Sequence, residues 1–392
     1  MNSQFSVFIK RSQIIAMGGA ARLLAALSSV TISVIIVRTQ SPGLWGEVVP
    51  FMLLLEFGFS VIGWGALPYL VQEFSLHPNF MKSQWTRSSF SRSWLLVLFL
   101  VIILFLEFTA TIKIYLIIWA AGRYIYQSFE PIAQVERNFL FSIIMEVSAL
   151  CITIIPVLIM KSPVTATLVV SFFAASMLWR AMISLIYFRK WISFSSPGLL
   201  YFREAFPFFL LTLSGMLQQR TDLYCVTYFL NDKETAVYQV YFNFLIFSQF
   251  LGSLLLSPFA KNIFRLRPPS LRKLEKKFIL AGVLLSLASV VAIFIMIRFF
   301  YHFELSRVMY GLGYFYILMF YMYLLRNYEM GKSYQQSTVA GYGFLGSLLN
   351  LVLCVFLIPR FGMEGALLAG SAAQFFIVIL YYRKKAPVNA QG

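Results

Sequence analysis

Apolar residues dominate this chain in long runs, and short polar stretches separate one run from the next. A run of about 20 apolar residues is long enough to cross the ~30 Å hydrocarbon core of a bilayer as a helix. Twelve such segments are predicted, at 13–37, 44–71, 94–110, 114–134, 138–160, 163–188, 205–229, 234–258, 278–300, 306–325, 336–359 and 363–382. The pattern therefore predicts an all-α polytopic membrane protein.

A faint internal repeat divides these segments into two halves. The first segment leads through a turn at 38–46 into a second that closes with Pro68, and the seventh leads through 231–238 into an eighth that closes with Pro258. An offset of about 190 residues is half the chain, as in transporters built from two equivalent bundles. Two six-helix bundles are therefore expected, at 1–195 and 196–392.

Composition and charge agree with a membrane setting. Hydrophobic residues make up 60% of the 392 positions, charged residues only 12%, and the net charge is +17. With the N-terminus inside, 21 basic residues fall in inner segments and seven in outer ones, which by the positive-inside rule places both termini in the cytoplasm. Basic residues beside anionic headgroups account for the net charge without a nucleic-acid partner.

Four arginines fall inside the apolar segments, at Arg22, Arg123, Arg180 and Arg220. Each costs roughly 2.5–3.5 kcal/mol near the centre of a membrane helix unless water or a partner compensates it. Such positions are therefore candidates for function.

The fourth segment carries a polar stripe. Arg123, Gln127, Glu130 and Gln134 recur at intervals of four, three and four, which places them on one helix face. A face of this kind either lines an aqueous cavity or is sealed against another helix by hydrogen bonds, and the cavity is favoured because four long polar side chains are difficult to satisfy without water.

The first segment has a similar stripe of smaller residues, Gly18, Arg22, Ala26, Ser29 and Ser33. Small residues on one face also form tight helix-packing seams, so this alternative stays open. Arg22 favours a cavity.

The seventh segment is interrupted by polar residues from Gln218 to Asp222. Arg220 and Asp222, two residues apart, point to nearly opposite helix faces, so each requires a different partner. Other charges available within the spans are Glu56, Glu146 and Arg180, and for the last two a charge pair that only fixes helix packing is an equally good interpretation.

Enzyme chemistry has little support. The only histidines, His77 and His302, fall in predicted loops, and there is no phosphate-binding GxxxxGK[ST] motif. Cys151, Cys225 and Cys354 are far apart in sequence and are interpreted as small core residues. We expect no catalytic residues, no metal and no cofactor.

Several motifs resemble a known family. The stretch from Gly19 through Arg22 to Gly46, the stretch from Arg220 to Tyr238, and the hairpin from Ile358 to Ala366 are similar to bacterial polysaccharide and O-antigen flippases. These belong to the multidrug/oligosaccharidyl-lipid/polysaccharide exporter superfamily. Gln40-Ser41 departs from the family's usual Leu-Gly in the first turn.

The resemblance implies two six-helix bundles that work by alternating access. It implies a multi-pass protein of the bacterial inner membrane that flips a lipid-linked oligosaccharide, often linked to undecaprenyl diphosphate, for O-antigen, lipopolysaccharide or other surface polysaccharide, beside other polysaccharide assembly proteins. Arg22 and Arg220 would bind the diphosphate by motif position.

Other assignments come from the residues themselves. The stripe adds Arg123 and Gln127 to the substrate-binding candidates, because a guanidinium suits phosphate oxygens. Asp222, Glu56 and Glu130 are candidate ion-coupling or cavity carboxylates, since a buried carboxylate can exchange a proton or a sodium ion. Buried acids nearly balance buried arginines, which weakens the expectation of a cationic cavity.

Two rival functions remain. A cation-coupled drug exporter of the same superfamily would present an acidic, aromatic cavity, whereas four buried arginines favour an anionic cargo. A membrane glycosyltransferase or polymerase would form a product that an assay of the purified protein detects.

Overall fold

A computed structural model describes residues 19–20, 23–24, 27–160, 163–193, 198–256, 268–332 and 335–383, and all of its regular structure within these ranges is helical. The chain forms two compact units, unit 1 (Met1–Leu213) and unit 2 (Ser214–Gly392). The division lies within a helix, 18 residues after the boundary at 195/196 that the sequence repeat suggests.

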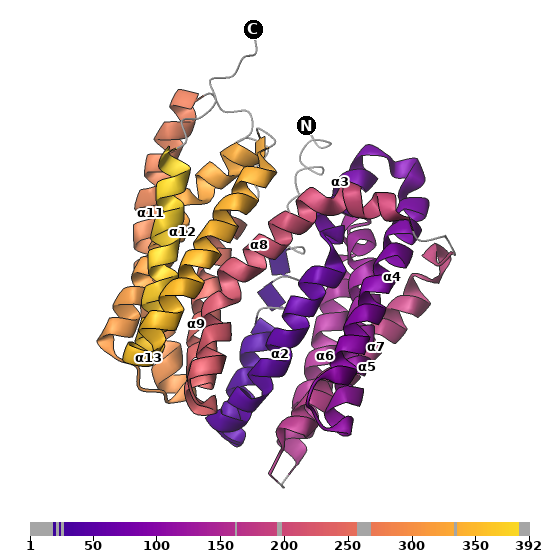
Figure 1. The fold of residues 1–392 in the computed structure, drawn as a ribbon, viewed down its shortest axis with the longest axis horizontal. Helices are drawn as coiled ribbons and strands as arrows, with labels where there is room; N and C mark the ends of the chain where they lie inside the picture. Colours follow the sequence, from indigo (N-terminus) through magenta and orange to yellow (C-terminus); the bar gives the residue numbers. More distant parts are fainter. Residues whose placement is uncertain are drawn as a thin grey trace, which may run out of the picture. The chain divides into compact units, whose positions relative to one another are not determined.

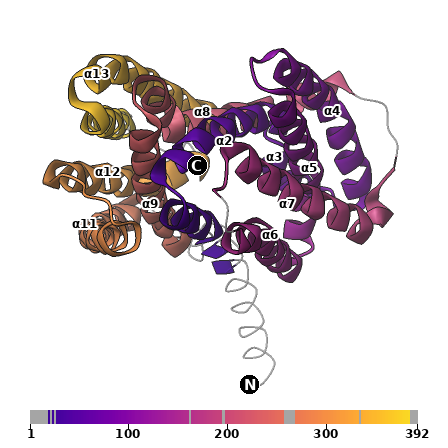
Figure 2. The same ribbon diagram turned by 90° about the horizontal axis from the view of Figure 1, so that it is seen from below.

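Unit 1 begins with the short apolar helix Leu27–Thr39. There follow α2 (Pro42–Gly63), α3 (Ala66–Leu76), the 3-10 turn η1 (Pro78–Phe80), α4 (Met81–Phe105), α5 (Ala110–Val135), α6 (Phe139–Ile159), α7 (Ala166–Tyr187) and the 3-10 turn η2 (Arg189–Trp191). α5 and α7 lie side by side (Figures 1 and 2), and their backbones approach so closely that a Cβ on Gly122 would lie 2.8 Å from the Met177 carbonyl.

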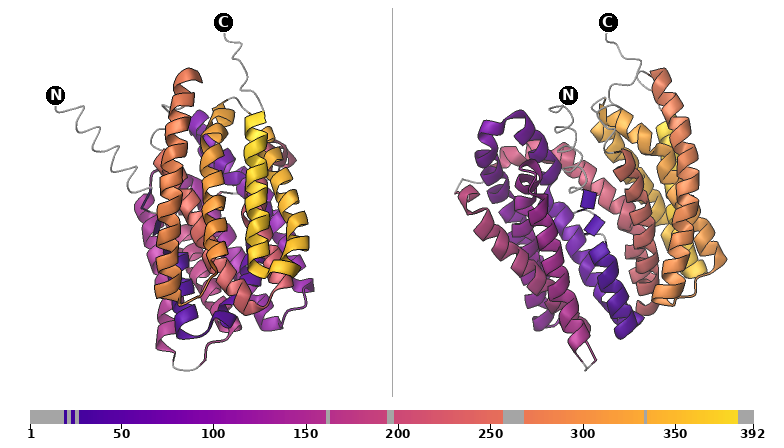
Figure 3. Two further views of the ribbon diagram at one scale, coloured as in Figure 1. Left: turned by 90° about the vertical axis from the view of Figure 1, so that its left-hand side faces the viewer. Right: turned by 180° about the vertical axis from the view of Figure 1, so that it is seen from behind.

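Unit 2 is built from α8 (Leu199–Phe229), which begins in unit 1, α9 (Asp232–Leu256), α11 (Pro268–Ile295) with the π-helical turn η4 (Met296–Tyr301), α12 (Arg307–Lys332) and α13 (Gln336–Arg383). α12 packs against both α11 and α13 (Figure 3). Gly362, with φ 55° and ψ −135°, breaks α13 into two helical stretches.

Where the structure describes the twelve predicted segments, they fall largely on helical residues; most of the first segment before residue 27 and the last two residues of the eighth lie outside the described part. Seven helices of the described part are long and apolar enough to cross a membrane, and α13 with its break at Gly362 supplies two predicted segments by itself. α5, α8 and α9 are not among the seven, because polar side chains lower their hydropathy.

The stretch 72–93, which lies between the second and third predicted segments, is mostly helical. α4 begins at Met81, and Trp85 in its polar half is 5% exposed and stacks on Phe129 at 5.0 Å between ring centroids. Phe129 stacks in turn on Phe188 at 5.2 Å. An aromatic core stabilises this helix where hydropathy alone predicts none.

Apolar side chains also cover parts of the outer surface. Leu280, Leu284, Leu287 and Val291 follow one face of α11 and are 52–65% exposed. A stripe of this kind is unfavourable in water and is the surface that lipid tails cover.

The break between α2 and α3 fixes both helices to the first half of α8. Trp64 and Gly65 both have positive φ, at 42° and 64°. The Trp64 indole stacks on Phe209 at 4.0 Å and its Nε1 donates to the Phe202 carbonyl at 3.0 Å. A Cβ on Gly65 would lie 2.4 Å from the Phe209 nitrogen, so only glycine fits there. These contacts explain why the first part of α8 belongs to unit 1.

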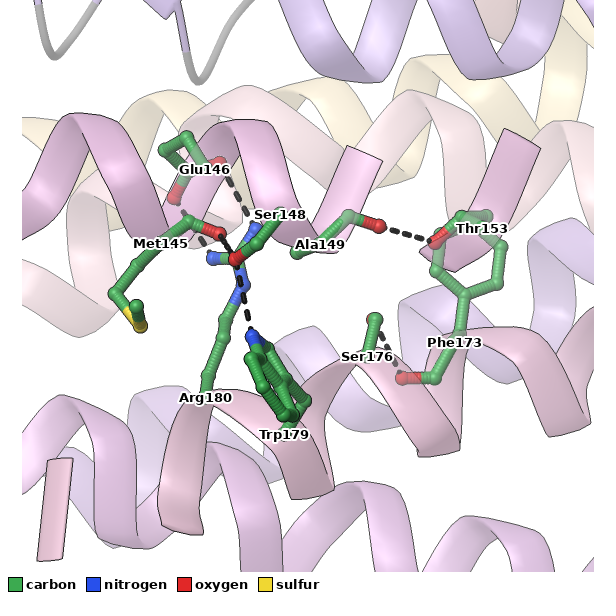
Figure 4. A network of polar contacts seen from close by, with 9 residues as sticks. All are labelled: Met145, Glu146, Ser148, Ala149, Thr153, Phe173, Ser176, Trp179 and Arg180. Atoms are coloured by element: carbon green, nitrogen blue, oxygen red, sulfur yellow. Dashed lines mark hydrogen bonds and ion pairs between the residues drawn. The ribbon is translucent and has the colours of Figure 1, made fainter. Parts of the chain in front are cut away.

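A charged pair joins α6 to α7 (Figure 4). Arg180 donates to both carboxylate oxygens of Glu146, at 2.7 and 2.9 Å, and its guanidinium carbon lies 5.3 Å from the Tyr126 ring centroid. Beside it, Trp179 Nε1 donates to Ser148 Oγ at 3.1 Å. The charge pair that the sequence offers for Glu146 and Arg180 is therefore present in the structure.

We expect Gly65→Ala to lower the free energy of unfolding by about 1–3 kcal/mol, because alanine is strained at this φ and its Cβ meets the α8 backbone. Thermal unfolding in detergent measures the effect. Gly63→Ala is the matched control, since nothing lies within 4 Å of a Cβ at Gly63. Equal stability of the two variants would contradict the account of the break.

Glu146→Gln should destabilise unit 1 by about 3–5 kcal/mol, because the partly buried Arg180 loses its counter-charge. Replacing both residues, as in Glu146→Leu with Arg180→Met, removes the uncompensated charge and should recover most of that loss. A double variant no more stable than Glu146→Gln argues against the pair as the cause.

Candidate functional site

The polar stripe of α5 lies on the side of the helix away from its main packing face. Phe129, Ile132 and Ala133 are buried on that packing face, whereas Gln127 is half-buried and Glu130 exposed. The stripe is therefore not sealed along its whole length.

Arg123 joins this stripe to α2. Its half-buried guanidinium lies 4.5 Å from the centroid of the Phe59 ring, a cation–π contact. Glu56, also half-buried, precedes Phe59 by one helical turn and shares its face of α2. Unit 1 thus places Arg123, Gln127 and Glu130 on one helix and Glu56 on the face of the neighbouring helix that Arg123 touches.

Arg22 lies outside the described residues, as do Gly18 and Ala26 of the same predicted stripe. Of the remaining members, Ser33 is buried and Ser29 exposed. The role of Arg22 stays a prediction.

In unit 2, Arg220 and Asp222 contact different residues, as their spacing predicts. Arg220 Nη1 donates to Asn243 Oδ1 of α9 at 3.0 Å. Asp222 is fully buried and accepts a hydrogen bond of 2.5 Å from the hydroxyl of Tyr238, also on α9. A Cβ at Gly370 of α13 would lie 3.5 Å from Asp222 Oδ2, so this helix passes directly beside the carboxylate.

A second polar group in unit 2 was not predicted from the sequence. Gln218 Nε2 donates to the Tyr323 hydroxyl at 3.0 Å and to Gln374 Oε1 at 3.3 Å, and Tyr323 donates to Gln374 at 3.1 Å. α8, α12 and α13 meet at these three side chains. Gln374 lies within a largely apolar segment, and a single polar residue forms no periodic pattern that would mark it as part of a site.

The four arginines have different environments. Arg180 is neutralised by Glu146, whereas Arg123 lies against a phenyl ring and Arg220 donates to an amide oxygen. These two belong to different units, and each is half-buried within its helix.

The histidines and cysteines were the remaining candidates for catalytic or metal-binding roles. His77 and His302 are exposed beside helix ends, and no cluster of three or more His, Cys, Asp or Glu side chains suited to a metal occurs in the part of the chain that the structure describes. Cys225 and Cys354 are buried next to each other in unit 2, whereas Cys151 is exposed on α6, which corrects its interpretation as a core residue.

Comparison with known proteins gives the fold. No family profile and no curated protein sequence matches the chain. The structure is similar to the lipid II flippase MurJ in its inward closed conformation, with a TM-score of 0.57 and 13% identity over 93% of this chain and 86% of that one.

It is also similar to multidrug resistance MATE family transporters of the MOP superfamily. The TM-score is 0.64 for an outward-facing structure, at 11% identity with 94% of each chain covered. For an inward-facing one it is 0.59, at 12% identity, covering 92% of this chain and 93% of that one. The chain therefore has the all-helical membrane fold that these flippase and exporter structures share.

Proposed function

We propose that this protein is a transporter of the multidrug/oligosaccharidyl-lipid/polysaccharide exporter superfamily that flips an anionic, lipid-linked oligosaccharide across the bacterial inner membrane by alternating access. The observation that carries the proposal is the placement of Arg123 and Arg220 at half-buried positions within helices of this fold. Similarity to a lipid II flippase supports a lipid-linked cargo.

The chemistry of guanidinium fits a diphosphate. Two planar, permanently charged groups each offer paired N–H donors to phosphate oxygens. Cation–π contact with Phe59 and a hydrogen bond to Asn243 orient the two groups. In this proposal Arg22 and Gln127 add further contacts to the diphosphate or the first sugars.

Asp222 is proposed to couple transport to an ion gradient. The carboxylate is fully buried and accepts from Tyr238, so gain or loss of its charge changes the contacts that α8 makes with α9 and α13. Glu56 and Glu130 are the corresponding carboxylates proposed for unit 1.

The proposed setting is a multi-pass inner-membrane protein with both termini in the cytoplasm, acting with other proteins of surface polysaccharide assembly. The second candidate function is a cation-coupled exporter of small organic cations. Its support is the similarity to MATE transporters and the buried acid Asp222. No catalytic role is proposed.

Arg123→Ala and Arg220→Ala should each reduce flipping of a diphosphate-linked oligosaccharide by about 10- to 100-fold, the loss expected when a charged hydrogen-bonded contact is removed. The measurement is leaflet exchange of a labelled lipid-linked sugar in proteoliposomes. Arg22→Ala should behave alike, and lysine at any of the three positions should retain part of the activity.

Arg360→Ala, which removes an exposed arginine, is the control for loss of positive charge. Full flipping by all three alanine variants at normal protein level would overturn the phosphate-binding role. Efflux of an organic cation by the wild-type protein, without lipid exchange, would favour the exporter instead.

Asp222→Asn keeps the shape of the side chain and removes its charge. We expect the variant to lose the response of transport rate to an imposed proton or sodium gradient, while passive exchange persists. Flux measured with and without the gradient tests this, with the exposed Asp232→Asn as control. A variant that responds to the gradient like the wild type excludes Asp222 as the coupling group.

A further inference from the structure

Unit 1 contains a buried arginine without a counter-charge. Arg92 lies in the polar half of α4, outside the twelve predicted segments, and is only 3% exposed. All 15 acidic side chains of the protein fall within the described residues. None of them forms an ion pair with Arg92. A buried cation in this situation is strongly unfavourable unless another species neutralises it.

The groups that contact Arg92 are all neutral. Arg92 Nε donates to Ser88 Oγ at 3.3 Å and Nη2 donates to Ser128 Oγ at 3.4 Å, both long for hydrogen bonds. The guanidinium carbon lies 5.6 Å from the centroid of the Tyr124 ring. Only two of the five N–H groups of a guanidinium are used by these bonds within the described residues.

A buried hydroxyl also lies next to Arg92. The Tyr201 side chain is adjacent to both Arg92 and Ser88, and its hydroxyl, although beside Ser88 Oγ, is not in hydrogen-bond geometry with any described residue. Tyr201 is 1% exposed and Ser88 0%. Ser88 Oγ accepts from Arg92 and lies beside the Tyr201 hydroxyl. The surroundings therefore contain an excess of donors around one positive charge.

The excess of hydrogen-bond donors around Arg92 favours a bound anion over a metal cation or a water molecule. A metal cation is repelled by the guanidinium and finds no carboxylate. A water molecule could accept from two of these donors, but it leaves the charge of Arg92 uncompensated. A small monovalent anion accepts from several donors at once and neutralises the charge.

We propose that Arg92, Ser88 and Tyr201 bind a chloride ion inside unit 1. A monatomic halide suits a site where Arg92, Ser88 and Tyr201 are at most 3% exposed, because larger oxyanions need more room and more donors. The ion would connect α4 to the start of α8, with Ser128 and Tyr124 of α5 completing the surroundings. This site is separate from Arg123 and Arg220 and does not depend on the transport proposal.

The test is halide-dependent stability of the purified full-length protein. Replacing gluconate by chloride or bromide at constant ionic strength should raise the midpoint of thermal unfolding by roughly 2–4 °C, as for a ligand present well above its dissociation constant. Arg92→Gln should abolish the halide dependence, and Arg203→Gln, which removes an exposed arginine nearby, should retain it.

Two further variants keep the proposal testable if Arg92→Gln fails to fold. Ser88→Ala and Tyr201→Phe each remove one hydroxyl donor and should each raise the halide concentration needed for half-maximal stabilisation about tenfold. A structure of crystals soaked in bromide should show an anomalous peak within contact distance of the Arg92 guanidinium. A wild-type protein equally stable in gluconate and chloride, or an unchanged halide dependence in all three variants, would overturn the proposal.

Discussion

The energetic penalty on charge inside an apolar solvent governs this structure. Each charged side chain within a membrane-spanning helix needs a carboxylate, a polar partner, an aromatic face or water. Arg180 has the carboxylate of Glu146, Arg220 the amide of Asn243, and Arg123 the ring of Phe59. These contacts differ in chemistry: Glu146 gives Arg180 a bidentate counter-charge, Asn243 accepts one hydrogen bond from Arg220, and Phe59 offers a ring face to Arg123.

α8 has a different role in each half of its length. Its first part is held to α2 and α3 by the stack of Trp64 on Phe209 and the bond from Trp64 to the Phe202 carbonyl. Its second part presents Gln218, Arg220 and Asp222 to α9, α12 and α13 of unit 2. The polar residues of α8 therefore contact different helices from different faces: Gln218 contacts α12 and α13, Arg220 contacts α9, and Asp222 contacts α9 and lies beside α13.

Arg92 shows how tertiary packing changes the meaning of a residue. By sequence it is one of several basic residues beside a polar loop, and the positive-inside rule accounts for it fully. In the structure α4 extends through this stretch, and an aromatic core of Trp85, Phe129 and Phe188 buries the same segment. Hydropathy averages polarity over a window of residues, so it does not reveal that a single polar residue such as Arg92 faces the protein interior.

The sequence by itself determined the all-helical membrane fold and the approximate positions of most of its described helices, because lipid requires long apolar runs and the helix satisfies the backbone within each run. It also determined that Arg220 and Asp222 require different partners, since helical spacing fixes their directions. Only the tertiary structure decided which charges meet across helices, such as Arg180 with Glu146, and which, such as Arg92, meet none. Partner choice depends on how helices distant in sequence approach one another, and periodicity within one helix contains no information about its neighbours.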